Sequence, residues 1–126
     1  MQQLFLVAIG GAIGSIARFK LAGFMMNQAT DWKFPLGTFT VNILGCLVIG
    51  ALAGLADKYD LFSPDWKIFL FTGLLGGFTT FSAFGLETMI LLRNGDIMTA
   101  LLYVSLSVII GVVLMYGSFM IFRHLF

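Results

Sequence analysis

The sequence predicts an all-α integral membrane protein with four transmembrane helices, and three observations support this prediction. Of the 126 residues, 60% are hydrophobic and only 10% are charged. The mean hydropathy is +1.02, which is more apolar surface than a soluble domain of this length can bury in one core. Four apolar stretches are each long enough for a helix across a bilayer, which takes about 20 residues.

The four stretches are expected to form a single transmembrane domain over residues 1–126. Their approximate ranges are 4–26, 37–56, 68–92 and 97–122. The connections NQATDWKFPL, DKYDLFSPDW and RNGD hold most of the charge, both prolines and both tryptophans, as turns at a membrane surface do. Such short connections leave no room for a soluble domain. Any activity must therefore be built from the helices themselves.

The first helix is expected to remain in the protein, because no basic residue precedes its apolar run as one does in a secretory signal. Near its end, Lys20 is expected to extend its side chain to the membrane interface. Arg18 cannot lose its charge, so in a water-filled vestibule it would create a positive potential that attracts anions. Glu87, the only acid within a span, is expected either to pair with such a cation or to cap a wet entrance.

The second helix carries a polar stripe, because Thr38, Asn42 and Gly45 follow one another at steps of four and three residues. The simplest interpretation of such a stripe is an interhelical hydrogen bond, which in membranes averages below about 1 kcal/mol. For Asn42 we favour a functional role. It lies near the start of a charge-free span and carries donors that could replace water around an anion.

The third helix is interrupted by GLLGGFTTFSAF at residues 73–84, and we expect it to break there, near mid-membrane. Glycine lowers helix stability by about 1 kcal/mol relative to alanine, and Thr and Ser side chains offer the backbone rival hydrogen bonds. Non-helical backbone at this depth survives only inside protein or beside water, where its freed carbonyls can bind a cation. The break is therefore a candidate ion site.

Two phenylalanines follow the break. Phe81 and Phe84 are three residues apart, so their rings are expected to project from one face of the resumed helix. The edge of an aromatic ring is slightly positive and can contact a small anion. Most Phe pairs at this spacing only face lipid or fill a core, but the neighbouring break and hydroxyl groups favour the pathway interpretation.

The fourth helix carries a second stripe, in which Tyr103, Ser107 and Gly111 follow a four-residue step. We interpret its other hydroxyl residues as partners in interhelical hydrogen bonds: Thr99, Ser105 and Ser118. Small residues also recur at the spacing that lets helix backbones approach closely. These pairs are Gly10 and Gly14, Gly50 and Gly54, and Gly73 and Gly77.

Basic residues are divided almost evenly between the two ends of the predicted bundle. Three fall at the end that carries the termini and four at the other: Lys58, Lys67 and Arg123 against Arg18, Lys20, Lys33 and Arg93. The positive-inside rule therefore hardly chooses an orientation. Such a near tie permits insertion both ways and hence an antiparallel homodimer. A conduction path would more naturally lie where two subunits meet, since four helices around a filled centre leave no lumen.

Three segments carry a family resemblance. GGAIGSIARF in the first helix, PLGTFTVNILG in the second and TGLLGGFTTFSAFGLE in the third resemble, in that order, the signatures of the Fluc (CrcB) family of fluoride channels. The resemblance implies a multi-pass protein of a prokaryotic cell membrane that lets fluoride leave the cytoplasm. It also implies a dual-topology, antiparallel homodimer with two fluoride pathways. A structural sodium ion at the two-fold axis would be held by the backbone carbonyls of Gly76 and Thr79.

The resemblance further implies which side chains line the pathway. Fluoride would pass the ring edges of Phe81 and Phe84 and meet Asn42. The other implied residues are hydroxyl residues near this path or a cation at its entrance: Thr38, Thr80, Ser82, Tyr103, Ser107 and Arg18. The fourth helix matches the family less closely than the first three.

The nearest alternative is a transporter of the small multidrug-exporter type, which has a similar length, four spans and dual topology. Proton-coupled exporters need a carboxylate in the first helix, where this sequence has Arg18 and Lys20 instead. An inert assembly subunit would not explain why glycines and hydroxyls gather at one depth. An enzyme is not expected, because His124 is terminal and no nucleophile, base and orienting group can be assembled. The scattered basic residues offer no tract for nucleic acid.

Overall fold

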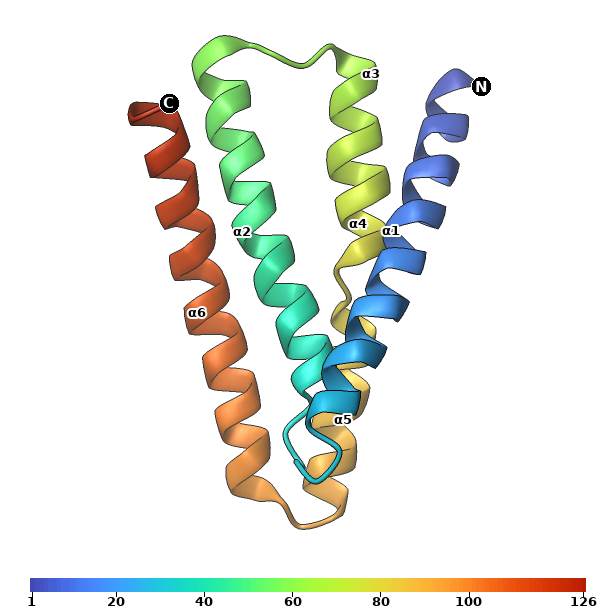
Figure 1. Cartoon of the computed structure of the whole chain (residues 1–126), viewed down its shortest axis with the longest axis vertical. Helices are drawn as coiled ribbons and strands as arrows, with labels where there is room; N and C mark the ends of the chain where they lie inside the picture. Colours follow the sequence, from blue (N-terminus) through green and yellow to red (C-terminus); the bar gives the residue numbers. More distant parts are fainter.

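The computed structural model describes all 126 residues, which form helices joined by short connections and no β-strand (Figure 1). Three long helices are continuous, whereas the third of the four membrane-crossing segments is divided into pieces. In chain order the elements are α1 (Gln2–Gln28), α2 (Leu36–Tyr59), α3 (Pro64–Lys67), η1 (Ile68–Leu75), α4 (Gly76–Phe78), α5 (Phe81–Arg93) and α6 (Ile97–His124).

Four segments are long and apolar enough to cross a membrane: Gln2–Gln28, Leu36–Tyr59, Pro64–Arg93 and Ile97–His124. Both chain termini and the α2–α3 connection lie at one end of the bundle, here called the terminal end (Figure 1). The α1–α2 and α5–α6 connections lie at the other, here called the loop end. The predicted all-α membrane protein with four spanning segments is confirmed.

The helices extend a few residues beyond the apolar stretches because local backbone signals decide where they end. Helix α2 ends where Asp60 adopts a positive φ of 49°. A new helix begins at Pro64, because the Ser63 hydroxyl accepts a hydrogen bond from the Trp66 N–H and proline suits the first helical turn. Between α5 and α6, Gly95 supplies the turn with a φ of 83°.

The segments pack as two pairs that together form a V (Figure 1). Helix α1 packs along η1 and α4, and α2 packs along α6. Glycines bring each pair close: a Cβ on Gly10 would lie 2.8 Å from the carbonyl oxygen of Phe69, and a Cβ on Gly54 would clash with the carbonyl of Phe119. The close approach expected from the glycine pairs is confirmed. The pairs meet at the loop end and spread apart towards the terminal end.

Candidate functional site

The third segment is broken at Thr79 and Thr80, which adopt extended backbone conformations between α4 and α5. The predicted break is confirmed, but the glycines are not where it falls. Gly73 and Gly77 lie in helical backbone against α1, because close packing outweighs their low helix propensity. The side chains of both threonines bond to backbone on either side of the break, and the bond of Thr79 adds to the one that its own N–H donates to Leu75. Thr79 Oγ1 donates to the carbonyl of Leu75 at 2.9 Å, and Thr80 Oγ1 caps α5.

Asn42 on α2 binds both backbone groups of Thr80. Its Nδ2 donates to the Thr80 carbonyl at 3.0 Å, and its Oδ1 accepts from the Thr80 N–H at 2.9 Å. Backbone groups freed by a break in a membrane must find such partners. One N–H of the amide is not used in these two bonds. Asn42 therefore stabilises the break, and the anion contact expected of it stays a prediction that depends on this remaining N–H.

We expect Asn42→Leu to destabilise the fold. The substitution removes the hydrogen-bond partners of the Thr80 N–H and carbonyl and puts an apolar side chain of similar size in place of the amide. Each unsatisfied group costs about 1–3 kcal/mol. Thermal unfolding of the purified protein in detergent checks this. Ser105→Leu is the matched control, since Ser105 is an exposed polar residue within α6. Equal unfolding temperatures for Asn42→Leu and the unmodified protein would contradict the bridging role.

Glu87 on α5 joins three helices through one carboxylate. Its Oε1 accepts a hydrogen bond from Thr38 Oγ1 of α2 at 2.7 Å, and its Oε2 accepts one from the Tyr103 hydroxyl of α6, also at 2.7 Å. Tyr103 is completely buried and Thr38 nearly so. Glu87 was not among the pathway residues that the family resemblance implied. The sequence signal was its status as the only acid in a span. Its hydrogen-bond partners are hydroxyls and not a cation, whereas its place in the wall of a cavity that Arg18 also lines is compatible with the other expectation, a wet entrance.

Arg18 lies beside a cavity of about 360 Å³ whose walls come from α1, α2 and α5. Thr38, Thr80 and Glu87 also line this cavity, here called the arginine cavity. The Arg18 Nε donates to the carbonyl of Gly77 at 3.2 Å, so the half-buried guanidinium is anchored at the end of α4. The vestibule position expected for Arg18 agrees with this cavity. Lys20, by contrast, is exposed as expected.

A second cavity, of about 310 Å³, lies between α2, α5 and α6 and is here called the phenylalanine cavity. Thr80 lines both cavities, and the second is also lined by the predicted sodium ligand Thr79 and by four of the predicted pathway residues: Asn42, Phe81, Phe84 and Ser107. The Ser107 hydroxyl oxygen is buried and has no hydrogen-bond partner. Polar groups and two phenylalanine side chains therefore line an open space on the second side of Thr80.

The two pathway phenylalanines differ in environment. Their ring centroids are 5.7 Å apart, with planes tilted by 40°. Phe84 is half-buried and packs on Tyr103 at 5.0 Å, whereas Phe81 is 83% exposed in the single chain. The expectation that both rings project from one face is consistent with this pairing. Ser82 is exposed and lies outside both cavity walls.

Of the two predicted sodium ligands, Gly76 lies just before the break and Thr79 lies in it. Gly76 begins α4 and is exposed, and Thr79 is the extended residue that follows this short helix. No cluster of three or more His, Cys, Asp and Glu side chains could hold a metal ion. The sodium site therefore depends on main-chain oxygens alone, and it stays a prediction.

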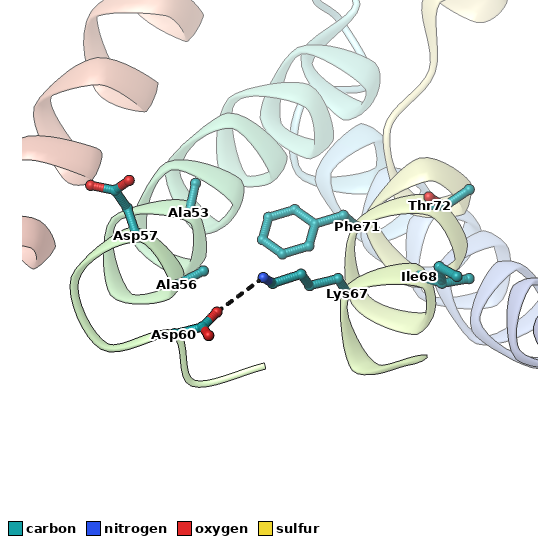
Figure 2. A pocket seen from close by; sticks show the side chains of 8 residues that line it. All are labelled: Ala53, Ala56, Asp57, Asp60, Lys67, Ile68, Phe71 and Thr72. Carbon is teal, nitrogen blue, oxygen red and sulfur yellow. Dashed lines mark hydrogen bonds and ion pairs between the residues drawn. The ribbon is translucent and has the colours of Figure 1, made fainter. Parts of the chain in front are cut away.

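A cleft of about 710 Å³ opens between α2 and the third segment at the terminal end (Figure 2). Phe71 and Lys67 reach across it from the third segment towards α2, and Lys67 Nζ lies 3.3 Å from Asp60 Oδ1 (Figure 2). Thr72, which is exposed, also lines this cleft. The open side of the V is therefore partly polar.

These features define a small multi-pass membrane protein whose polar groups converge on a broken helix between two cavities, as in channels and transporters. Comparison with known families gives a more specific result. The family model described as "CrcB-like protein, Camphor Resistance (CrcB)" matches residues 5–119. The chain belongs to this family, as the resemblance in its first three helices predicted.

Similar proteins cover almost the whole chain. A protein of Methylobacillus flagellatus named "Fluoride-specific ion channel FluC" is 60% identical over 119 residues, which are 94% of this chain and 93% of that protein. A protein of the same name from Flavobacterium psychrophilum is 42% identical over 125 residues, covering 99% of this chain and 100% of that protein. A third, from Caulobacter vibrioides, is 39% identical over 128 residues and covers 100% and 99%.

Proposed function

We propose that this chain is a fluoride-selective ion channel that lets fluoride leave the cytoplasm down its electrochemical gradient and so lowers cellular fluoride. The observation that carries the proposal is the pair of cavities that share Thr80, one lined by a fixed cation and the other by two phenylalanines and free donors. The names of the relatives supply the identity of the ion. We place the channel in the cell membrane of a prokaryote.

The groups along the two cavities suit a small anion. Arg18 keeps a positive charge at the arginine cavity and would raise the local anion concentration. The unused Asn42 N–H and the unpaired Ser107 hydroxyl are donors that can replace part of the ion's hydration shell. The edges of Phe81 and Phe84 add polarised C–H groups. A dehydrating fluoride ion would thus meet donors on both sides of Thr80.

We further propose that two copies assemble as an antiparallel, dual-topology homodimer. The third segment exposes polar or small residues at a depth where lipid would otherwise cover them: Thr72, Gly76, Ser82 and Gly85. Phe81, a pathway residue, is also exposed in one chain, so the pathway would be incomplete without a second surface. The partly polar cleft on the open side of the V adds a surface that a second copy can cover (Figure 2).

We also propose that the assembled homodimer binds a structural sodium ion. Main-chain oxygens suit a hard cation, and freed carbonyls at helix breaks coordinate Na⁺ in membrane proteins. One chain would offer the carbonyls of Gly76 and Thr79, and an antiparallel partner would supply the same pair again. The exposure of Gly76 is compatible with this arrangement. When bound, the ion would supply fixed positive charge that balances the oxygen dipoles and favours anions nearby.

Reconstituted protein is expected to release fluoride and not chloride from loaded liposomes. The larger ion would need a wider path than the few donors and ring edges around Thr80 provide. Ion-selective electrodes measure the release of each anion in the presence of a potassium ionophore, and detergent gives the total content. Protein-free liposomes are the control. Equal rates for both anions would defeat the proposed selectivity, and no release of either would defeat the channel itself.

A further inference from the structure

Phe34, in the connection between α1 and α2, packs directly on a member of the polar cluster. Its ring meets that of Tyr103 edge-to-face, with centroids 5.4 Å apart and planes at 88°. Phe34 also makes an edge contact with Phe39 at 5.1 Å. Tyr103 is fully buried, and its hydroxyl donates to Glu87 Oε2. A loop residue therefore touches the ring that supplies one of the two donors to the carboxylate.

The residue before Phe34 ties this connection to the start of α6. Lys33 Nζ lies 2.7 Å from Asp96 Oδ1. Asp96 is itself held in place, because its N–H donates to the Leu91 carbonyl and its carbonyl accepts from the Ala100 N–H. The ion pair therefore joins the connection to a fixed point at the loop end.

The two contacts fall on the same face of α6. Asp96 and Tyr103 are seven residues apart, which corresponds to about two turns of α-helix. Lys33 and Phe34 are consecutive, so one reaches the beginning of the helix while the other packs deeper along the same face. The connection, residues 29–35 and here called the strap, thus lies over α6. The Lys33–Asp96 ion pair holds its exposed side, and the contact between Phe34 and Tyr103 holds its buried side.

We propose that Phe34 is a positioning residue for the ion pathway: together with the Lys33–Asp96 ion pair, it holds the Tyr103 hydroxyl on Glu87. This inference rests on the proposed function, because Glu87, to which the Tyr103 hydroxyl donates, lines the arginine cavity of the proposed pathway. The Tyr103 ring is packed by Phe34 and by Phe84, which lies at 5.0 Å. Removing the Phe34 ring leaves space in which Tyr103 can turn, and Glu87 Oε2 then loses its donor.

The first test reports on Tyr103 and does not depend on transport. The chain has three tyrosines, so in a Tyr59→Phe, Tyr116→Phe background Tyr103 is the only one left. NMR of the full chain labelled with ¹³C at the tyrosine Cζ then shows one signal, which is sensitive to hydrogen bonding of the hydroxyl. Phe34→Leu should shift or broaden this signal. An unchanged signal would overturn the proposal, whatever the protein conducts.

The second test measures fluoride efflux from liposomes. Phe34→Leu should lower the rate by about two- to tenfold, the range expected for losing one edge-to-face aromatic pair. Phe34→Tyr keeps the ring and should restore most of the rate, which a merely structural defect in the loop would not predict. If the unmodified protein conducts no fluoride, the proposed function fails, while the NMR result still decides the position of Tyr103.

The matched control is Phe69→Leu. Phe69 is also half-buried and makes an edge-to-face contact with Trp66 at 5.7 Å and 89°, but it lies near the terminal end. It should change neither readout, and an equal loss of efflux in Phe69→Leu would overturn the proposal. Lys33→Met removes the ion pair with Asp96 and so weakens the attachment of the strap to α6. Because the Lys33 side chain is 69% exposed, this substitution disturbs little packing. It should move the Tyr103 signal in the same direction by a smaller amount, since exposed ion pairs contribute little.

Discussion

Phe81→Ile is expected to lower fluoride efflux by about 10- to 100-fold, because losing one interaction with a charged species costs about 1.5–3 kcal/mol. Fluoride gives up a very large hydration energy when it leaves water, and each polarised C–H edge has to replace part of it. Isoleucine is similarly apolar and suits a membrane helix, but it has no such edge. The rate of conduction should therefore fall while expression and oligomeric size stay unchanged.

The environment of Phe81 makes this substitution easier to interpret than one at Phe84. Phe81 is 83% exposed in the single chain, so its replacement removes little packing within that chain. Phe84 packs on Tyr103, and a change there would also disturb the residue that binds Glu87. A loss of conduction at Phe81 is thus attributable to its ring in the pathway.

Two further variants separate ring chemistry from bulk. Phe81→Met should retain more conduction than Phe81→Ile, because a thioether is polarisable and its methyl hydrogens are slightly positive. Phe5→Ile on α1 is the matched control, since Phe5 is 68% exposed and lies outside both cavities. Liposome efflux and size-exclusion chromatography are measured for all three. Phe81→Ile protein of unchanged size that conducts at the unmodified rate would remove Phe81 from the pathway.

The four spans were predictable because bilayer thickness fixes the length of an apolar run, and the runs are separated by short polar turns. The exact position of the break was not. Glycine is the weakest ordinary helix former, yet Gly73 and Gly77 remain helical because α1 packs closely against them. Within the predicted range 73–84 the break falls at Thr79 and Thr80, where the Thr80 side chain caps α5 and Asn42 binds the Thr80 backbone. Tertiary packing, which a local sequence pattern does not contain, therefore decided whether the break falls at the glycines or at the threonines.

The site was predictable in its residue types and only partly in its connections. The four-residue steps singled out Asn42 and Ser107, which line one cavity, but they did not indicate that Thr38 and Tyr103 lie outside it. The bonds of Glu87 to Thr38 and Tyr103 cross 49 and 16 residues of sequence, so no periodicity indicates them. Likewise, nothing local indicates that the Asn42 amide binds Thr80. Long-range hydrogen bonds between helices thus had to come from the structure.

The near tie in basic residues makes the proposed antiparallel dimer testable by charge alone. Orientation follows the side with more Lys and Arg in short connections. At the loop end, Thr30 and Asp31 are exposed, and at the terminal end, Leu61 and Phe126 are exposed. Two lysines at the loop end change the count of basic residues to six against three, whereas at the terminal end they change it only to five against four. The terminal-end variant therefore also carries Lys20→Gln and Arg93→Gln, at two exposed residues, which makes its count five against two. The two variants should then be forced into opposite orientations.

One forced variant carries Thr30→Lys and Asp31→Lys, and the other carries Leu61→Lys and Phe126→Lys together with Lys20→Gln and Arg93→Gln. Each variant alone is expected to lose nearly all fluoride efflux from cells, because an antiparallel dimer needs one subunit of each orientation. Coexpression of the two variants should restore efflux, since each then supplies the partner that the other lacks. Accessibility of a cysteine tag at the C-terminus to an impermeant reagent verifies the orientation, and coexpression of two copies of the same variant is the control. Full efflux from either variant alone would show that one orientation suffices. Exposed Phe81 would then have to be covered by a parallel copy or by lipid.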